Sequence, residues 1–579
     1  MANKHTPILL FLILAFSCQR SATSEVKLVP GKPEHGSIAT GKTQSYLLSL
    51  TAGDFVQVRI ETRGAGLLKV YGPSGSKGRG FDVGRENMGF VVEATGPHRI
   101  EIAPDENTPE FAYTITLVKV VALADRLAAA PAEYESPRIK SLRTAIETGR
   151  RGSVADFWEK VKAEGTPLIE PLEGDDKNDL VTFLWEGKPD THNVLLLWWP
   201  YTGQSPDDYR MLHLNETDVW YKTLKVDSRK RFVYRLAINS PHLPVDLGLL
   251  TPDLLSLLDA ATEPDPLNPK RWAVRGDDPD APQHQGFSVV EMPKAPVQPW
   301  LKKRPGVPQG QIERREVASA LLKNKREISV YLPPEYSREA KPYGILLLFD
   351  EAVYLNSERN GTIVPTPTIL DNLISENRIP PLIVVFIDNP LDTRTKELTC
   401  NPTFADFLNS ELVPWVRRSY NVTVDARQTV IGGSSFGALA ASCAGLRYPE
   451  TFGNILSQPG GYWWTPPKRN PSDPDPEPDW MAKQFIERPR LALRFYMDAG
   501  TDELDLTGNG GDILVPNRNL RDVLLAKGYE VHYQEFNGGH DGLSWRGTLA
   551  DGLILLMGNA PPRASQQSAG TPQPEPTIP

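Results

Sequence analysis

One segment of the chain reads Thr429-Val430-Ile431-Gly432-Gly433-Ser434-Ser435-Phe436-Gly437-Ala438-Leu439-Ala440. An apolar strand precedes G-x-S-x-G and a helix of small residues follows it, which is the setting of the sharp strand-to-helix turn in α/β-hydrolases. We expect a Cβ at either flanking glycine to collide with a neighbouring strand or the helix. The turn would expose the Ser435 hydroxyl at the helix N-terminus, where the Phe436 N–H can bind a developing oxyanion. The sequence therefore predicts Ser435 as a nucleophile.

The same pattern of strands and helices extends on both sides of this turn. Apolar runs over 343–350, 381–388 and 493–498 alternate with helical segments. Continuous apolar strands of this kind are typical of a mostly parallel sheet that helices cover on both faces. We therefore expect an α/β-hydrolase domain over residues 306–560.

A serine nucleophile needs a base, and in this fold the acid and then the histidine follow the serine along the chain. Only His532 and His540 lie downstream. His532 sits in an alternating run that predicts an ordinary strand position. His540 lies in the glycine-rich segment 537–541, which can present an imidazole at the edge of the sheet. We predict His540 as the base.

The acid of the triad should follow the strand over 493–498. Its carboxylate would hold the imidazole tautomer and stabilise the imidazolium. Glu503 is the first choice and Asp502 the next, with Asp505 or Asp498 behind them. The second oxyanion N–H should come from the loop after an earlier strand, where the backbone of Glu351 is the candidate.

The N-terminus is typical of an exported protein. A charged start, an apolar run over 8–16 and then Ser17-Cys18 form a secretory signal, and the segment is too short to span a bilayer. The run ending at Cys18 resembles a bacterial lipoprotein box, in which the cysteine becomes the lipid-modified N-terminus. We expect a periplasmic or outer-membrane lipoprotein that contacts the membrane only through this anchor.

Two β-sandwich domains should precede the α/β-hydrolase domain, because short alternating strands separated by Gly/Pro turns occur in two regions. The first resembles the prepeptidase C-terminal sandwich of secreted bacterial hydrolases. The predicted organisation is 1–23 signal peptide, 24–119 β-sandwich, 120–165 helical connector, 166–305 Ig-like domain, 306–560 α/β-hydrolase domain and 561–579 disordered Pro-rich tail.

Composition excludes several classes of function for these 579 residues. A net charge of −9 and a pI of about 5.7 lack the basic footprint that nucleic acids require. The cysteines Cys18, Cys400 and Cys443 offer no metal-ligand spacing, so we expect no metal. Cys400 and Cys443 are taken as buried free thiols, with a disulfide between them as the alternative.

Several linked motifs give the chain a more specific resemblance. The catalytic part resembles that of enterochelin (enterobactin) esterases over 433–437, 448–453, 456–464 and 538–547. Residues 217–220, 265–269 and 291–296 resemble the N-terminal Ig-like domain of that family. The resemblance covers about 166–560, two domains in the family's order.

The resemblance implies hydrolysis of the ester bonds of a catecholate siderophore trilactone, with no cofactor and with ferric iron only as part of the substrate. It implies Ser435 as nucleophile, His540 as base and then acid, and Glu503 as the orienting carboxylate. Trp463 and Trp464 would stack on a catechol ring or cover the core. Arg394 would meet an anionic substrate or form an ion pair inside the domain.

The chain departs from the family at the oxyanion loop and at the leader. Asp350-Glu351 replaces the family's usual Asp-Gly, so a side chain there would narrow or recharge the pocket. Because export is unusual for the family, a second hypothesis is a serine carboxylester hydrolase or acyltransferase acting on a feruloyl-type, S-formylglutathione-type or xenobiotic ester. A third is a non-catalytic surface lipoprotein that kept the fold.

Overall fold

The computed structural model describes residues 26–62, 66–74, 77–83, 88–92, 94–104, 110–122, 134–199, 210–214, 216–239, 262–272, 286–355, 363–467, 478–503 and 513–558. The chain forms two compact units, residues 1–126 and 127–579. The predicted leader with Cys18, the alternative acid Asp505 and the Pro-rich tail lie outside the described residues. None of the helices in the described part has the length and hydropathy that a membrane span requires.

The first unit is a β-sandwich of two sheets, with strand orders β1-β3-β8-β5-β6 and β2-β9-β4-β7. Alternation explains its core, because Val56, Val58 and Ile60 of one strand are buried while Arg59 between them is exposed. The strands are β1 Val26–Lys27, β2 Pro33–Ala39, β3 Gln44–Leu50, β4 Phe55–Thr62, β5 Gly66–Tyr71, β6 Lys77–Val83, β7 Met88–Val91, β8 Gly96–Pro104 and β9 Glu110–Val121.

The second unit begins with two helices and a second sandwich, whose sheets have the orders β10-β11-β14-β13 and β12-β15-β17-β16. Phe183 and Tyr234 meet edge to face in its core, with ring centroids 4.8 Å apart. The elements are α2 Pro137–Glu147, α3 Ser153–Glu164, β10 Leu168–Pro171, β11 Asn178–Glu186, β12 Val194–Trp199, β13 Leu212–His213, β14 Val219–Asp227, β15 Arg231–Ile238, β16 Arg271–Trp272 and β17 Phe287–Glu291.

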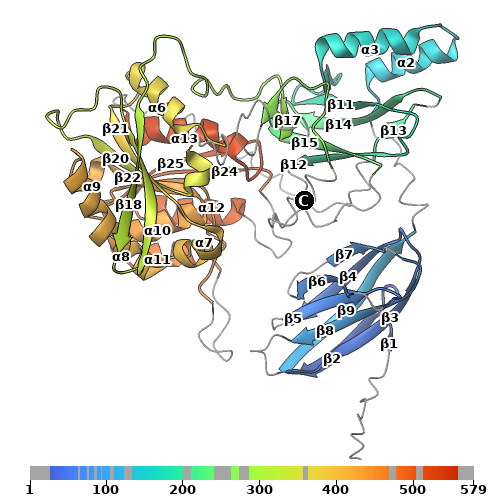
Figure 1. Cartoon of the computed structure of the whole chain (residues 1–579), viewed down its shortest axis with the longest axis horizontal. Coiled ribbons are helices and arrows are strands. Elements are labelled where there is room, and N and C mark those ends of the chain that lie inside the picture. Colours follow the sequence, from blue (N-terminus) through green and yellow to red (C-terminus); the bar gives the residue numbers. More distant parts are fainter. Residues whose placement is uncertain are drawn as a thin grey trace, which may run out of the picture. The chain divides into compact units, whose positions relative to one another are not determined.

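The helices α2 and α3 lie on the outer face of this sandwich (Figure 1). Ile139, Trp158 and Val161 of the two helices pack with Leu184 and Tyr221 of the sheet. The helical connector predicted over 120–165 starts too early, because β9 continues through Val121. Residues 123–133 lie outside the described residues, and the remaining segment is interrupted after α2, so α2 and α3 form a hairpin.

The remainder of the second unit is built on an eight-stranded sheet of order β18-β19-β21-β20-β22-β23-β24-β25. Pairing is antiparallel from β18 through β19 to β21 and parallel across all later neighbours. The strands are β18 Gln311–Ser319, β19 Asn324–Leu332, β20 Gly344–Phe349, β21 Leu382–Ile387, β22 Thr429–Ser435, β23 Asn454–Gly460, β24 Arg494–Gly500 and β25 Glu530–Phe536.

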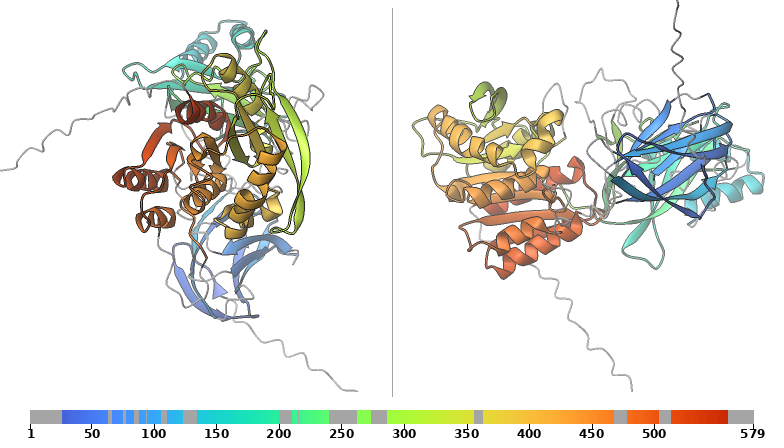
Figure 2. Two further views of the ribbon diagram at one scale, coloured as in Figure 1. Left: turned by 90° about the vertical axis from the view of Figure 1, so that its left-hand side faces the viewer. Right: turned by 90° about the horizontal axis from the view of Figure 1, so that it is seen from below.

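Helices cover both faces of this sheet (Figure 2), which explains why its central strands are apolar without alternation. One face packs against α5 Glu351–Tyr354, α6 Thr366–Ser375 and α13 Gly542–Met557. The other packs against α7 Leu391–Leu398, α8 Pro402–Phe407, the π-helical turn η2 Leu408–Leu412, α9 Val413–Ser419, α10 Phe436–Arg447, α11 Trp480–Ile486 and α12 Leu514–Ala526.

The turn from β22 into α10 is strained, as the sequence predicts. Ser435 has φ 57° and ψ −122°, a conformation that side chains rarely adopt. The glycine with the least space for a Cβ is not one of the two motif glycines. A Cβ at Gly432 would approach the Leu456 carbonyl oxygen to 2.5 Å and one at Gly433 would approach the Gly437 Cα to 3.1 Å, whereas one at Gly437 would make an ordinary 3.4 Å contact.

A disulfide joins Cys400, which follows α7, to Cys443 in α10, so the expectation of two free thiols is wrong. Their Cα atoms lie 5.5 Å apart, within the range that a disulfide spans. The two cysteines are 43 residues apart in sequence, and no local pattern places the end of α7 against α10.

Candidate active site

The structure brings three of the predicted site residues to one edge of the sheet. Ser435 ends β22, Glu503 follows β24, and His540 follows β25. These strands pair in parallel through β23, so their carboxyl ends lie at the same edge. The order Ser, acid, His along the chain is the one expected for an α/β-hydrolase.

The imidazole of His540 lies beside a buried carboxylate. Its Nδ1 atom is 3.4 Å from Oε1 of Glu503, whose side chain is fully buried. The Trp545 ring meets the imidazole edge to face at a centroid distance of 5.0 Å. Burial lowers the pKa of His540 to about 4; the charge of Asp541 opposes this shift and that of Arg394 adds to it. The imidazole is therefore neutral at pH 7, as a general base must be.

The loop that carries Glu503 is attached to the loop that carries His540. Thr501 N donates to Phe536 O at 2.9 Å, and Asp502 N donates to Gly538 O at 3.1 Å. These backbone bonds continue the pairing of β24 and β25 beyond the strands. They fix the separation of the carboxylate and the imidazole more firmly than the side chains alone could.

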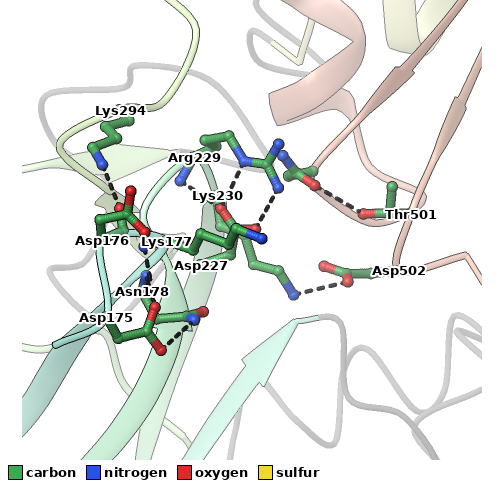
Figure 3. Close-up of polar contacts among 11 residues, drawn as sticks. Asp175, Asp176, Lys177, Asn178, Asp227, Arg229, Lys230, Lys294, Thr501 and Asp502 are labelled. Carbon is green, nitrogen blue, oxygen red and sulfur yellow. Dashed lines mark hydrogen bonds and ion pairs between the residues drawn. The ribbon is translucent and has the colours of Figure 1, made fainter. Parts of the chain in front are cut away.

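The alternative acids have other partners. Asp502 forms a 2.8 Å ion pair with Lys230, which belongs to the second sandwich (Figure 3). Asp498 accepts a 3.1 Å hydrogen bond from Tyr496 OH, and burial holds its pKa well above the usual range. Glu503 is thus the carboxylate whose oxygen the structure places beside the His540 imidazole, with 3.4 Å between Oε1 and Nδ1.

His532 and Asp541, which lie near this loop, each contact other residues of the domain. His532 lies on β25, with Nε2 3.4 Å from Glu530 Oε1. Asp541 begins α13, where its side chain accepts a hydrogen bond from Ser544 N at 3.0 Å. Burial raises the pKa of Asp541 to about 7.

The predicted oxyanion loop follows β20. Asp350 has φ 56° and donates its N–H to Asn389 Oδ1 at 3.1 Å, and Glu351 starts the short helix α5. The Glu351 side chain accepts a 2.8 Å hydrogen bond from Ser329 Oγ on β19, and burial raises its pKa to about 7. The additional side chain at this position is therefore held by β19, which lies two strands from β20 in the sheet.

Arg394 forms the intradomain ion pair that the sequence left as one alternative. Its Nε and Nη2 atoms donate to the two carboxylate oxygens of Asp350 at 2.6 and 2.8 Å. The guanidinium also lies 5.8 Å from the ring centroid of Phe436, the residue after Ser435. Arg394 thus connects the loop after β20 to the first residue of α10.

The two tryptophans lie in different surroundings. The Trp463 ring packs on Phe436 at a centroid distance of 5.6 Å, whereas Trp464 meets Trp480 of α11 edge to face at 5.5 Å. Both are partly buried. Trp463 is therefore the one in contact with the residue that follows Ser435.

Sequence reasoning missed two contributors to this arrangement. Lys230 is 272 residues from Asp502, and a lysine in a hairpin turn carries no signal of such a contact. Trp545 lies five residues after His540, and the first turn of α13 directs its ring back to the imidazole. A glycine-rich loop followed by a helical aromatic residue could have indicated it. Within the described ranges, no group of three or more His, Cys, Asp or Glu side chains is arranged to hold a metal.

Comparison with known proteins follows the same two-domain division. Residues 319–556 match the family described as "Putative esterase", and residues 180–301 match "Enterochelin esterase, N-terminal". The chain is 30% identical to the iron(III) enterobactin esterase of Escherichia coli O6:H1 over 65% of this chain and 90% of that protein. It is 28% identical to the iron(III) salmochelin esterase of the same organism, over 72% and 98% respectively.

A solved structure extends the likeness to three dimensions. The enterobactin esterase of Shigella flexneri, crystallised in the presence of enterobactin, is 27% identical to this chain with a TM-score of 0.53. The match covers 69% of this chain and 97% of that protein.

Proposed function

The chain belongs to the enterochelin esterase family, and from this premise we propose that it hydrolyses the ester bonds of a catecholate siderophore trilactone, enterobactin or its ferric complex. It is a carboxylic ester hydrolase. The observation that carries the proposal is the 3.4 Å approach of the His540 imidazole to the buried Glu503 carboxylate, after β25 and β24, at the same edge of the sheet as the strained Ser435 turn.

The proposed mechanism is acyl transfer to Ser435. Its Oγ attacks the ester carbonyl while His540 accepts the hydroxyl proton, and the carbon–oxygen bond to the leaving serine hydroxyl of the lactone then breaks as His540 returns the proton. Water, deprotonated by His540, hydrolyses the acyl-enzyme. Glu503 holds the imidazole orientation and stabilises its protonated form.

Two backbone N–H groups would stabilise the oxyanion of the tetrahedral intermediates. Phe436 N lies at the start of α10, and Glu351 N lies at the start of α5. Such donors contribute about 3–4 kcal/mol of transition-state stabilisation when they are preorganised. The Asp350–Arg394 ion pair supports both positions, because Arg394 contacts Asp350 on one side and the Phe436 ring on the other.

Substrate recognition is proposed for the aromatic segment. Trp463 packs beside Phe436, so a catechol ring attached to the acyl group bound at Ser435 could stack on its face. Trp464 would extend or support this surface. The Arg394 guanidinium is paired with Asp350, so it would attract an anionic substrate by longer-range electrostatics and not by direct contact.

The decisive experiment incubates the purified full chain with apo and ferric enterobactin and resolves the trimer, dimer and monomer of dihydroxybenzoylserine by chromatography. Products that appear with the parent and not with Ser435→Ala would establish the proposal. If the trilactone remains intact while a nitrophenyl ester is cleaved through Ser435, the esterase chemistry stands and the siderophore substrate is wrong.

Export is proposed separately. The Cys400–Cys443 disulfide supports it, because structural disulfides form mainly in oxidising compartments outside the cytoplasm. We propose that Cys18 carries the lipid and that the protein is a periplasmic or outer-membrane lipoprotein. Palmitate labelling that is lost in Cys18→Ser would support this, and cytosolic fractionation of the unlabelled parent would contradict it.

A further inference from the structure

The Ig-like domain reaches the loop that carries the proposed catalytic acid. Lys230, in the turn between β14 and β15, places its Nζ atom 2.8 Å from Oδ1 of Asp502 (Figure 3). Asp502 precedes Glu503 directly in the chain. We propose that Lys230 is a positioning residue of the active site, which acts through Asp502 to hold Glu503 against His540. The inference rests on the proposed role of Glu503 as the acid of the triad.

The turn that carries Lys230 is fixed within its own domain. Arg229 donates from Nε and Nη2 to the two carboxylate oxygens of Asp227, at 3.0 and 2.7 Å. Lys230 N donates to Asp227 O at 3.0 Å, and Met292 N donates to Lys230 O at 3.1 Å. Lys294 N also donates to Ser228 O at 2.7 Å. The lysine is therefore presented from a rigid base, so it can restrain its partner.

The loop on the catalytic side is restrained through its backbone, and the Lys230 ion pair adds a restraint on one of its side chains. Asp502 N donates to Gly538 O at 3.1 Å, Glu503 N donates to Gly500 O at 3.2 Å, and Ile513 N donates to Glu503 O at 3.0 Å. Asp502 and Glu503 share one planar peptide group, so a shift of the Asp502 backbone also moves the peptide to which Glu503 is attached. The carboxylate–imidazole separation of 3.4 Å is already longer than a strong hydrogen bond, which leaves little tolerance for displacement.

The ion pair is sheltered from solvent. The Lys230 and Asp502 side chains are only 20% and 16% exposed. Among the described residues, Oδ2 of Asp502 is buried with no hydrogen-bond partner, and Lys230 Nζ is the cation that contacts this carboxylate. Removing one partner of such a pair leaves a poorly solvated charge, and the loop would then move to hydrate it.

The experiment compares Lys230→Met with Lys294→Met in the full chain, using a small nitrophenyl ester. Lys294 belongs to the same domain, and its Nζ donates to Asp176 O within that domain, so it is the matched control. We expect Lys230→Met to lower kcat about tenfold to a hundredfold with KM within about twofold, the size of effect that a misplacement near 1 Å produces. Lys294→Met should retain parental kcat, and Lys230→Arg should restore much of the loss.

A double-mutant cycle separates positioning from general destabilisation. If Lys230 acts through Glu503, Lys230→Met should cost almost nothing further in a Glu503→Gln background. A cost equal in both backgrounds, or a Lys230→Met rate equal to that of Lys294→Met, would overturn the inference. An unchanged rate in Glu503→Gln alone would instead overturn the proposed role of Glu503.

A second variant covers the case in which Lys230→Met does not fold. Asp502→Asn removes the charge from the other partner and keeps the backbone bond to Gly538. Like Lys230→Met, this variant should lower kcat and leave KM unchanged. The fall in kcat should likewise disappear in the Glu503→Gln background. Full activity in a folded Asp502→Asn protein would contradict the inference.

Discussion

The glycines around Ser435 differ in the space that is available for a side chain. A Cβ at Gly432 would lie 2.5 Å from a backbone oxygen of β23, which cannot move without disturbing the sheet. A Cβ at Gly437 would make ordinary contacts with Phe349. Gly437, the motif glycine on the helix side, thus has more room for a side chain than Gly432, which lies outside the motif.

Gly432→Ala should therefore destabilise the protein, by about 1–3 kcal/mol for overpacking of this kind. Gly437→Ala should be neutral or stabilising by up to about 1 kcal/mol, because alanine favours a helix. Thermal unfolding of the two variants against the parent tests this contrast. Equal losses at both positions would show that the close approach at Gly432 is not the cause.

Glu351 should make stability depend on pH. Burial raises its pKa in the folded protein to about 7 from an unfolded value of 4.5. Its contribution is then fully present below pH 4.5 and is lost as the pH rises through about 7. Glu351→Gln keeps an acceptor for Ser329 and carries no charge, so we expect it to melt several degrees above the parent at pH 8 and close to the parent at pH 4.5. Melting curves at the two pH values measure this difference, and an identical shift at both would contradict it.

The activity should fall on the acid side only at an unusually low pH. Burial lowers the pKa of His540 to about 4 from 6.5, so the imidazole remains a neutral base well below pH 6. The pH profile of kcat/KM for a nitrophenyl ester should therefore fall off near pH 4–5. A midpoint near 6.5 would show that His540 is more solvated than its burial indicates.

Among the elements, the disulfide joins the end of α7 to the helix that starts at Phe436. Arg394, which pairs with Asp350, lies in α7, so the covalent bond ties together two elements that surround the Ser435 turn. The chain between the cysteines includes α8, η2, α9 and β22. Closing this loop restricts the unfolded chain over a large part of the domain.

Loss of this bond should lower stability by about 2–4 kcal/mol. We expect Cys400→Ala/Cys443→Ala to melt below the oxidised parent and reductant to bring the parent down to the level of the variant. The variant itself should not respond to reductant, which provides the control. A parent that is equally stable with and without reductant would argue against a stabilising role.

The features that could be predicted from the sequence are those that a local pattern of residues determines. The apolar strands, the β22–α10 turn and the glycine-rich loop of His540 each carry their signal within about ten residues. The Cys400–Cys443 bond and the Lys230–Asp502 pair depend on which elements meet in space, which no run of residues encodes. The direction of the Glu351 side chain also depends on a strand that is not adjacent to β20 in the sheet, since Ser329 lies on β19.

For the molecule as a whole, every described residue of the candidate site lies in the unit of residues 127–579. A chain that begins at Leu127 should therefore cleave a nitrophenyl ester with kcat/KM within about twofold of the parent. A further truncation to residue 306 should lose most of that activity, because it removes Lys230. Comparable activity in both truncated chains would show that the Ig-like domain is dispensable for catalysis.

The first turn of α13 packs against the second sandwich. Leu543 packs with Val233 and Val289, Gln298 donates to Leu543 O at 2.9 Å, and Arg546 Nε donates to Gln298 Oε1 at 2.9 Å. His540 lies three residues before Leu543, so a change in the outline of the sandwich would reach the imidazole. We therefore expect chimeras that exchange sandwiches between relatives to lose activity even when both halves fold, unless the residues that contact Leu543 are exchanged with them.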